Sequence, residues 1–450
     1  FSGNTASGDG ADQGGGGFFN NGGTATLTGV VVSGNVADGA AGSGGGLLND
    51  GGTLNLTGLT VSSNTAVRAG GGLEITTANA RASTVTVANT TFDQNTTGAS
   101  PGNGGGIHVT DIASGPASLL TLVGGALTGN SAAAEGGGVW NDVGGTLIIG
   151  GSTITGNVAG GDSPDQGGGG VFNNGGQGTI ANATIDSNIA DGVAGSGGGI
   201  LNDGGSLSLA DVSVSGNSAV RAGGGLEITT ANARDSDVLV DGVIFDANVT
   251  GASPGNGGAV HVTDPVGDNV STLSILASTV TNKTADQEGG GLWNDAGGSL
   301  SVEATQLANN VANAANAAAD IQGGGGVFNN GGTVTLTDVT LDSNDAAGPA
   351  EADDGGGGIA NVSGGGVTIR DSVISANTAD SGSGNGGGIL NAAGATLQVN
   401  NVQFTGNSAA RAGGALENEG VASLTEVTAS LNSAGVNGGM LHITGTGSTS

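Results

Sequence analysis

The sequence predicts an all-β fold, a parallel β-helix of about 15 coils with three short strands in each coil. The repeating unit is clearest at residues 44–69, GGGLLNDGGTLNLTGLTVSSNTAVRA. Apolar and polar residues alternate there in three short runs, and a period of two indicates strands. The turns between the runs are too short for crossover helices, and each run is too short to be stable alone. The strands must therefore pair with copies of themselves, as they do in a solenoid.

The first strand of each coil follows a run of glycines, where tight turns and close backbone approach favour a residue without a side chain. The residue after each run is apolar in all 15 copies. Side chains alternate across a strand, so a column that is always apolar predicts a buried inner face. The column consists of Phe18, Leu47, Leu73, Ile107, Val139, Val171, Ile200, Leu226, Val260, Leu292, Val327, Ile359, Ile389, Leu416 and Leu441.

Each coil ends on an apolar residue followed three positions later by Asn, as in Val32 and Asn35 or Phe92 and Asn95. The pattern recurs 15 times, and only Lys283 replaces the Asn. We predict a stacked ladder of side-chain amides that satisfies backbone groups of the turn and tolerates left-handed backbone geometry.

The coil lengths recur in a fixed order. Between the ends of the glycine runs, from residue 17 to residue 170, the steps are 29, 26, 34, 32 and 32 residues, and the next set again starts 29, 26, 34, 32. We therefore predict one continuous β-helix, 1–450, built of modules 14–166, 167–322 and 323–450, the last with an extra coil and truncated. Because the chain opens and stops inside repeats, we expect it to be a piece of something longer.

Composition limits the partners. The net charge is −31 and only seven residues are basic, so we expect no binding to nucleic acid, which requires a concentrated basic patch. The chain has no cysteine, hence no thiolate metal site. No stretch approaches the apolar length of a membrane helix, so we expect no direct membrane insertion.

The GGGI or GGGL starts, together with FSGN at Phe1, FDQN at Phe92, FDAN at Phe245 and FTGN at Phe404, resemble the repeats of the polymorphic outer-membrane protein (chlamydial-type) family of bacterial surface proteins. The resemblance covers the whole chain. It implies a right-handed parallel β-helix displayed outside the cell as an adhesin or an autotransporter passenger. We therefore expect an extracellular or cell-surface location on a bacterium.

The sequence predicts no catalytic residue and no enzyme. β-Helical lyases need a strong base or cation near a uronate, and hydrolases need two carboxylates across a cleft. The acidic residues here stand singly in turns (Asp50, Asp142, Asp203, Asp295), and every conspicuous motif occurs two or three times. The Arg of VRAGGGLE, before Glu74 and Glu227, and that of ARAGGALE, before Glu417, predict a salt bridge that holds a turn.

No cofactor is predicted, although acidic loops on successive coils could bind Ca²⁺ weakly through carboxylates and carbonyls. The alternative is a solvated acidic surface that keeps a glycine-rich protein soluble. The loop acids are Asp9, Asp12, Asp162, Asp165, Asp353 and Asp354.

One position beyond the inner column lies a second column, which we call the strip. Alternation turns it outward, and its Glu and His members agree with that. It is either covered by overhanging loops as a secondary core, or an exposed contact surface for another solenoid or for stacked sugar rings. The strip is Phe19, Leu48, Glu74, His108, Trp140, Phe172, Leu201, Glu227, His261, Trp293, Phe328, Leu390, Glu417 and His442, with Ala360 between the last Phe and Leu.

These observations lead us to expect a non-catalytic extracellular bacterial surface protein, an adhesin or a structural filament segment. The expected partners are further copies of the chain, associated laterally or end to end, or a host or cell-surface glycan or protein. The alternative is a glycan-binding or glycan-degrading β-helix protein of the polysaccharide lyase or glycosidase type.

Overall fold

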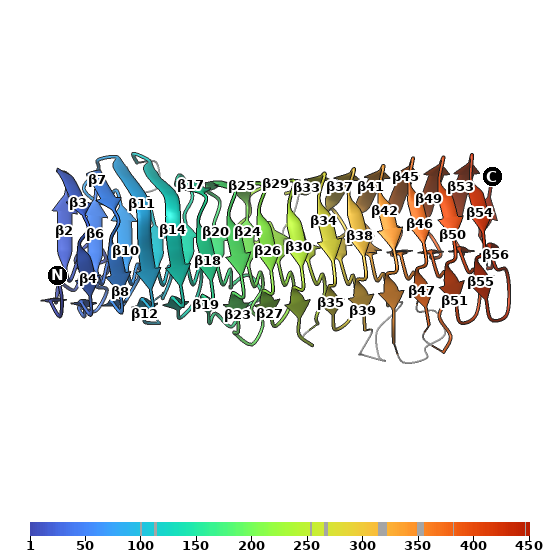
Figure 1. The fold of residues 1–450 in the computed structure, drawn as a ribbon, viewed down its shortest axis with the longest axis horizontal. Helices are drawn as coiled ribbons and strands as arrows, with labels where there is room; N and C mark the ends of the chain where they lie inside the picture. Colours follow the sequence, from blue (N-terminus) through green and yellow to red (C-terminus); the bar gives the residue numbers. More distant parts are fainter. Residues whose placement is uncertain are drawn as a thin grey trace. The chain divides into compact units, whose positions relative to one another are not determined.

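The computed structural model describes residues 1–99, 101–111, 115–252, 254–264, 269–313, 322–348, 355–380, 382–445 and 447–450. In that part of the chain there is no helix, and parallel strands stack as a β-solenoid of about 14 turns (Figure 1). The predicted fold class is confirmed. Fifteen glycine runs enclose only 14 complete turns, which accounts for the difference from the predicted 15 coils.

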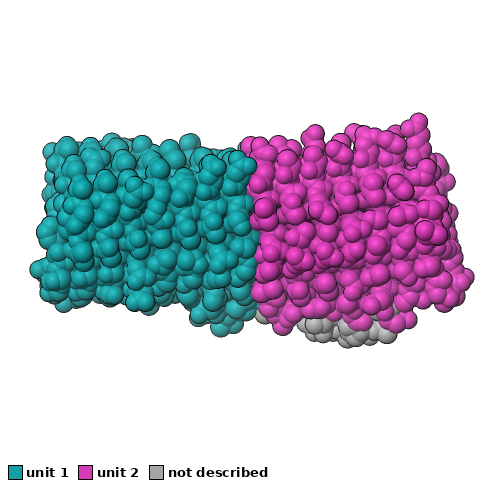
Figure 2. Space-filling view, in the orientation of Figure 1, with its two compact units in different colours: residues 1–220, 231–237 teal, residues 221–230, 238–450 magenta. Residues whose placement is uncertain are grey.

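The described residues divide by their contacts into two compact units (Figure 2). Unit 1 is Phe1–Val220 with Ala231–Asp237, and unit 2 is Arg221–Thr230 with Val238–Ser450. The division falls inside the second predicted module, 167–322, so the units do not follow the sequence modules.

The strand after each glycine run belongs to what we call the first sheet, and it pairs in parallel with the same strand of the next coil. In unit 1 the strands are β2 (Phe18–Asn21), β6 (Leu47–Asp50), β10 (Leu73–Thr76), β13 (Ile107–Val109), β16 (Val139–Asn141), β20 (Val171–Asn173) and β24 (Ile200–Asp203). In unit 2 they are β28 (Leu226–Thr229), β32 (Val260–Val262), β36 (Leu292–Asp295), β40 (Val327–Asn330), β44 (Ile359–Val362), β48 (Ile389–Asn391), β52 (Leu416–Asn418) and β56 (Leu441–Ile443).

The second sheet consists of longer strands and of shorter strands that follow them in the chain. In β11 and β14 the longer and the shorter strand form one continuous strand. Its unit 1 strands are β3 (Thr24–Thr28), β7 (Gly52–Thr57), β11 (Ser83–Asp93), β14 (Ser118–Thr128), β17 (Thr146–Gly150), β21 (Gln177–Ala181) and β25 (Gly205–Ala210), then β4 (Val31–Ser33), β8 (Thr60–Ser62), β18 (Thr153–Thr155), β22 (Thr184–Asp186) and β26 (Ser213–Ser215). The unit 2 strands are β29 (Ser236–Asp241, in unit 2 from Val238), β33 (Ser271–Leu276), β37 (Ser299–Glu303), β41 (Thr333–Thr337), β45 (Gly366–Arg370), β49 (Thr396–Asn400), β53 (Val421–Thr425) and β57 (Ser448–Thr449), then β30 (Ile244–Asp246), β34 (Thr279–Thr281), β38 (Gln306–Ala308), β42 (Thr340–Asp342), β46 (Val373–Ser375), β50 (Gln403–Thr405) and β54 (Thr428–Ser430).

A third sheet consists of two-residue strands that follow the Asn of each coil, and the sequence did not predict it. Two residues are too few to show an alternating pattern. The strands are β1 (Thr5–Ala6), β5 (Val36–Ala37), β9 (Thr65–Ala66), β12 (Thr96–Thr97), β15 (Ser131–Ala132), β19 (Val158–Ala159), β23 (Ile189–Ala190) and β27 (Ser218–Ala219) in unit 1, and β31 (Val249–Thr250), β35 (Thr284–Ala285), β39 (Val311–Ala312), β43 (Asp345–Ala346), β47 (Thr378–Ala379), β51 (Ser408–Ala409) and β55 (Ser433–Ala434) in unit 2.

The predicted inner column forms the core of each coil. It is buried throughout except in the first and last coils, where Phe18 and Leu441 are half-buried. Inward residues of the second sheet, such as Leu54, Leu56 and Val61, are also buried and complete the same apolar interior. The period-two pattern therefore located the core correctly.

The amide ladder is confirmed. Asn64 Nδ2 donates to Asn95 Oδ1 at 2.9 Å and to the Val32 carbonyl oxygen at 3.0 Å, and the Asn64 backbone N–H donates to the same Asn95 Oδ1 at 3.1 Å. The left-handed residue, however, is the one before each Asn, as at Ser63 (φ 55°) and Gln94 (φ 52°). The expectation that the Asn itself sits at the left-handed position is therefore wrong.

Candidate functional site

The strip is not exposed. Twelve of its 14 predicted members expose at most 6% of their surface, and only Phe19 (43%) and His442 face solvent appreciably. The expectation of an exposed aromatic contact patch is therefore wrong for Leu48, Glu74, His108, Trp140, Phe172, Leu201, Glu227, His261, Trp293, Phe328, Leu390 and Glu417. The alternative, a secondary core on the outer side of the first sheet, describes the structure.

The glycine runs explain this burial. The glycine four positions before each strip residue has a positive φ and lies against that residue or the backbone before it. At Gly136 (φ +63°) an added Cβ would lie 2.6 Å from the Val139 carbonyl oxygen and 2.8 Å from Trp140 Cβ. Only glycine tolerates both the dihedral angle and the approach. The chain therefore folds back over the strip before each first-sheet strand begins, which an alternation rule applied to an isolated strand does not anticipate.

In unit 1 the strip contains a row of paired polar and aromatic side chains. Arg68 Nη2 lies 3.1 Å from Glu74 Oε1, so the predicted salt bridge is confirmed here. His108 Nδ1, one coil further, lies 2.9 and 3.1 Å from the two oxygens of the same carboxylate. The imidazole stacks on Trp140 at 4.5 Å between ring centroids, and Trp140 stacks on Phe172 at 6.2 Å.

Unit 2 contains the same row. Arg221 and His261 lie 3.3 and 3.0 Å from Glu227 Oε1, and His261 stacks on Trp293 at 4.2 Å. Trp293 in turn stacks on Phe328 at 6.3 Å. The last coils of unit 2 repeat the beginning of the row, with His442 Nδ1 2.9 Å from both Glu417 oxygens.

The row extends to carboxylates outside the strip. Trp140 Nε1 donates to Glu135 Oε2 at 2.9 Å, and Asn103 Nδ2 donates to the same oxygen at 3.2 Å. Burial raises the pKa of the Glu135 carboxyl, while these hydrogen bonds and the nearby His108 oppose the shift. Burial likewise raises the pKa of Glu417, opposed first by its hydrogen bond to His442.

The row shows no arrangement suited to catalysis. Glu74, His108 and Trp140 are at least 94% buried, and the polar contacts that we describe for them are made to one another, to Arg68 or to Glu135. A general acid or base needs hydrogen-bond reach to a substrate, which these side chains lack in this conformation. Within the described ranges, no group of three or more His, Asp or Glu side chains gathers to hold a metal ion.

Of the predicted single acids of the turns, Asp50 and Asp203 are buried, and Asp142 and Asp295 are half-buried. Burial raises the pKa of Asp203 to about 6, the nearby carboxylates of Asp165 and Glu135 add to the shift, and the Asn232 N–H and Arg234 oppose it. Burial also raises the pKa of Asp50 and of Asp142. Of the loop acids, Asp353 and Asp354 lie outside the described residues.

Unit 1 has a groove of about 270 Å³ on the outer side of the first sheet, beside Glu74. The lining residues come from the connection between β1 and β2, the connection between β9 and β10, the end of β10 and the turns that follow β10 and β13. The groove is lined by Ala11, Asp12, Arg68, Thr76, Ala78, Thr110 and Asp111.

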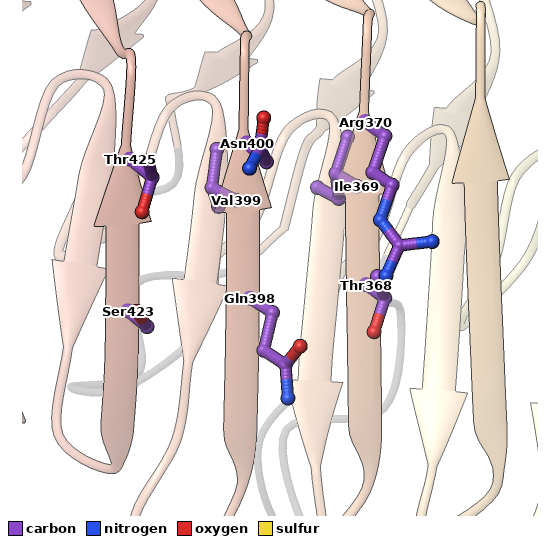
Figure 3. Close-up of a pocket in the computed structure, with 8 residues that line it drawn as sticks. All are labelled: Thr368, Ile369, Arg370, Gln398, Val399, Asn400, Ser423 and Thr425. Atoms are coloured by element: carbon purple, nitrogen blue, oxygen red, sulfur yellow. The ribbon is translucent and has the colours of Figure 1, made fainter.

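Unit 2 has a smaller depression of about 100 Å³ on the outer face of the second sheet (Figure 3). Side chains of β45, β49 and β53 line it, and Arg370 and Gln398 project over it from neighbouring strands. The depression is lined by Thr368, Ile369, Arg370, Gln398, Val399, Asn400, Ser423 and Thr425.

Comparison with known proteins identified no relatives. No protein-family model matches the chain, and no curated protein and no solved structure matches it either. Among the described residues, no helix has the length and apolarity needed to cross a membrane.

Sequence reasoning missed two features of the site. A second amide ladder runs along the first sheet, where Asn141 Nδ2 donates to Asn173 Oδ1 at 2.8 Å and Asn173 Nδ2 donates to Asn202 Oδ1 at 2.7 Å. Its signal, an Asn two positions after the inner column, is present in most coils. The groove has no comparable signal, because its lining comes from four separate segments of the chain.

Proposed function

We propose that the chain is a non-catalytic extracellular scaffold, an adhesin or a segment of a surface filament, on a bacterium. The observation that carries this proposal is the duplication of the Arg–Glu–His–Trp–Phe row, with salt-bridge distances of 3.1 and 3.3 Å and His–Trp separations of 4.5 and 4.2 Å. An active site places its reacting groups beside a space for the substrate. In both copies the Glu and His instead direct their polar groups at one another, the Trp N–H is directed at a neighbouring glutamate, and in unit 1 only Arg68 of the row borders a hollow.

The surface composition agrees with a role outside the cell. A net charge of −31 on a chain with 99 glycines favours solubility through mutual repulsion. Outward positions of the second sheet carry mostly hydroxyl and amide side chains, such as Thr86 and Thr121 on adjacent coils about 4.8 Å apart, although the exposed Ile148 follows Thr121. A surface that repeats in this way suits many weak contacts of one kind, whose combined strength exceeds that of each contact.

Glycan binding is a second candidate role, and the groove of unit 1 favours it. Glycan degradation is the alternative activity, and the assay of released products described below tests it directly. The resemblance of the repeats to bacterial surface proteins is consistent with either binding role.

Two assays test the proposal. The full chain and its Glu74→Gln/Glu227→Gln variant are incubated with mannan, galactan, xylan and polygalacturonate, and released reducing ends and unsaturated uronates are measured. We expect no product from either protein. Product formed by the parent and lost in the variant would overturn the non-catalytic assignment.

The second assay measures adhesion. Beads coated with the full chain are tested for retention on mannan, galactan and xylan surfaces and on surfaces coated with the chain itself, with albumin-coated beads as the control. Retention above the control on at least one of these surfaces is expected. Beads that behave like albumin on all of them, together with monomeric particles in electron microscopy, would contradict both the adhesin and the filament roles.

A further inference from the structure

The groove of unit 1 differs from the other described hollow because its cation is fixed in place. Arg68 Nη2 is held by Glu74 Oε1 at 3.1 Å and Arg68 Nε by Ser43 Oγ at 2.9 Å. Glu74 and Ser43 are fully buried, while the Arg68 side chain keeps 16% of its surface exposed. A guanidinium has five N–H donors. The remaining donors of Arg68 can therefore serve the groove without the entropic cost of ordering a free side chain.

The same groove also contains two negatively charged carboxylates. Asp12, which is exposed, and Asp111, which is half-buried, both line the groove. Asp111 Oδ1 accepts from Thr77 Oγ1 at 3.4 Å, and Asp111 Oδ2 accepts from the Ser118 N–H at 3.2 Å. These two hydrogen bonds fix the orientation of the carboxylate. Each carboxylate oxygen has more than one acceptor site, so capacity for a further hydrogen bond remains.

The remaining lining consists of small and hydroxyl side chains. Thr76 and Thr110 add hydroxyl groups, and Ala11 and Ala78 add methyl groups. In unit 2, by contrast, the smaller depression is lined by long exposed side chains, Arg370 and Gln398, whose ordering would oppose binding. Of the two hollows described above, the groove of unit 1 is the one that combines a fixed donor, Arg68, a fixed acceptor, Asp111, and apolar contacts.

This combination identifies a ligand class. The positive charge of Arg68 would repel a metal ion, and the carboxylates of Asp12 and Asp111 would repel an anionic ligand. A neutral sugar has hydroxyl groups that both donate and accept, and C–H faces that contact methyl groups. The volume of about 270 Å³ is just below the roughly 300–1,000 Å³ of typical small-molecule pockets, which suits one or two sugar rings.

We propose that this groove binds a residue of a neutral glycan, with Asp12 and Asp111 accepting from ring hydroxyls and Arg68 donating to a hydroxyl or ring oxygen. The inference rests on the proposed adhesin role and names its ligand. Glu74 and Ser43 act as positioning residues, because they touch Arg68 and not the ligand.

The test is co-sedimentation of the full chain with insoluble mannan, galactan and xylan, and with calcium-free polygalacturonate as the charged counterpart. We expect binding to at least one neutral polysaccharide and about tenfold weaker binding to polygalacturonate. Asp12→Asn, which retains the fold because Asp12 is exposed, should weaken neutral binding about tenfold. Ala11→Trp, which fills the groove, should abolish it.

Two control variants carry the same substitutions elsewhere in unit 1. Asp38→Asn changes the charge on an exposed loop, and Ala181→Trp adds a large ring on the second sheet. Both should bind like the parent, and circular dichroism should match for all five proteins. Absence of parent binding to every neutral polysaccharide, tighter binding to polygalacturonate, or parental binding by Asp12→Asn and Ala11→Trp would overturn the inference. Retention of the beads on the surface coated with the chain itself does not depend on the groove. Failure of the groove is therefore distinguishable from failure of the proposed function.

Discussion

Two coils of unit 2 bury a polar side chain at the same position in opposite ways. At Asn310, Nδ2 donates to Val280 O and to Asn344 Oδ1, both at 2.9 Å, and the backbone N–H donates to that same Oδ1 at 3.1 Å. One coil earlier Lys283 is fully buried, and its Nζ donates to the Thr281 carbonyl oxygen at 2.6 Å. Burial lowers the pKa of the Lys283 ammonium to about 7, although the charge of Asp246 opposes the shift.

A second residue accompanies the change. In the other coils of unit 2 but the last, the Asn packs against a glycine of the glycine run. An added Cβ at Gly291 would lie 2.5 Å from the Gly326 carbonyl oxygen and 3.4 Å from Asn310. Beside Lys283 that glycine is replaced by Ala259. In unit 2 before the last coil, glycine therefore accompanies Asn and alanine accompanies lysine, whereas in the last coil Ala415 accompanies Asn432.

The comparison shows that burial of a polar side chain costs little free energy when the neighbouring coils supply its hydrogen-bond partners. An amide in the ladder finds its donor and its acceptor in neighbouring coils that carry the same residue. A lysine has no acceptor in its amine and finds no equivalent group above or below it, so it loses hydration with little in return.

The largest expected effect follows from breaking the ladder where it is complete. Asn130 in unit 1 accepts at Oδ1 from Asn95 and donates from Nδ2 to Phe92 O and Asn157 Oδ1 at 3.0 and 2.9 Å. Asn130→Ala leaves buried partners unsatisfied and should lower the free energy of unfolding by about 3 kcal/mol. The outward Asn55→Ala on the second sheet should change it by less than about 0.5 kcal/mol. Urea titration followed by circular dichroism measures both, and equal effects would refute the role of the ladder.

Restoring the regular packing should have the opposite sign. Ala259→Gly/Lys283→Asn is expected to raise the free energy of unfolding at pH 7 by about 2 kcal/mol, since it exchanges a desolvated charge for an amide pair. Lys283→Asn alone should gain less, because the amide must then share space with the Ala259 methyl group. The coupling energy between Ala259 and Lys283, measured in a double-mutant cycle, should be about 1 kcal/mol. Strict additivity would show that the two residues are independent.

The pH dependence sharpens the same comparison. Because the folded pKa of Lys283 is about 7 and an unfolded lysine titrates near 10.4, the unfolded chain binds more protons between these values. The destabilisation is therefore complete below about pH 7 and is relieved as the pH rises toward 10. The stability difference between the parent and the double variant should shrink by at least about 1 kcal/mol from pH 7 to pH 9.5. A constant difference would contradict the buried ammonium.

Replacement of Asp203 in unit 1 should change the free energy of unfolding by a smaller amount, again because a charge is buried. Its folded pKa of about 6 lies above that of an unfolded aspartate, so its contribution to stability is lost as the pH rises through 6. Asp203→Asn retains the acceptor for the Asn232 N–H and should raise the unfolding free energy by about 1 kcal/mol at pH 7, but not at pH 3.5. A benefit that persists at pH 3.5 would point to a cause other than charge.

The fold was predictable from the sequence because two columns repeat in every coil. The inner column and the Asn positions are local patterns, and stacking identical coils leaves few alternatives for either. The burial of Trp140 and Phe172 was not predictable, because it depends on chain that folds back at Gly136 and not on the strand itself. The groove likewise depends on how turns from separate coils approach one another.

The hydrogen bonds of both amide ladders all run in one direction within each unit. In every described pair the Nδ2 of an earlier coil donates to the Oδ1 of a later one, from Asn35 to Asn64 in unit 1 and from Asn344 to Asn377 in unit 2. The ladder on the first sheet has the same sense, from Asn173 to Asn202 and from Asn329 to Asn361. Aligned amide dipoles add and polarise one another. Each unit therefore carries two parallel columns with partial positive charge toward its later coils and partial negative charge toward its earlier ones, so stacking gives each unit an electrical direction as well as a sequence direction.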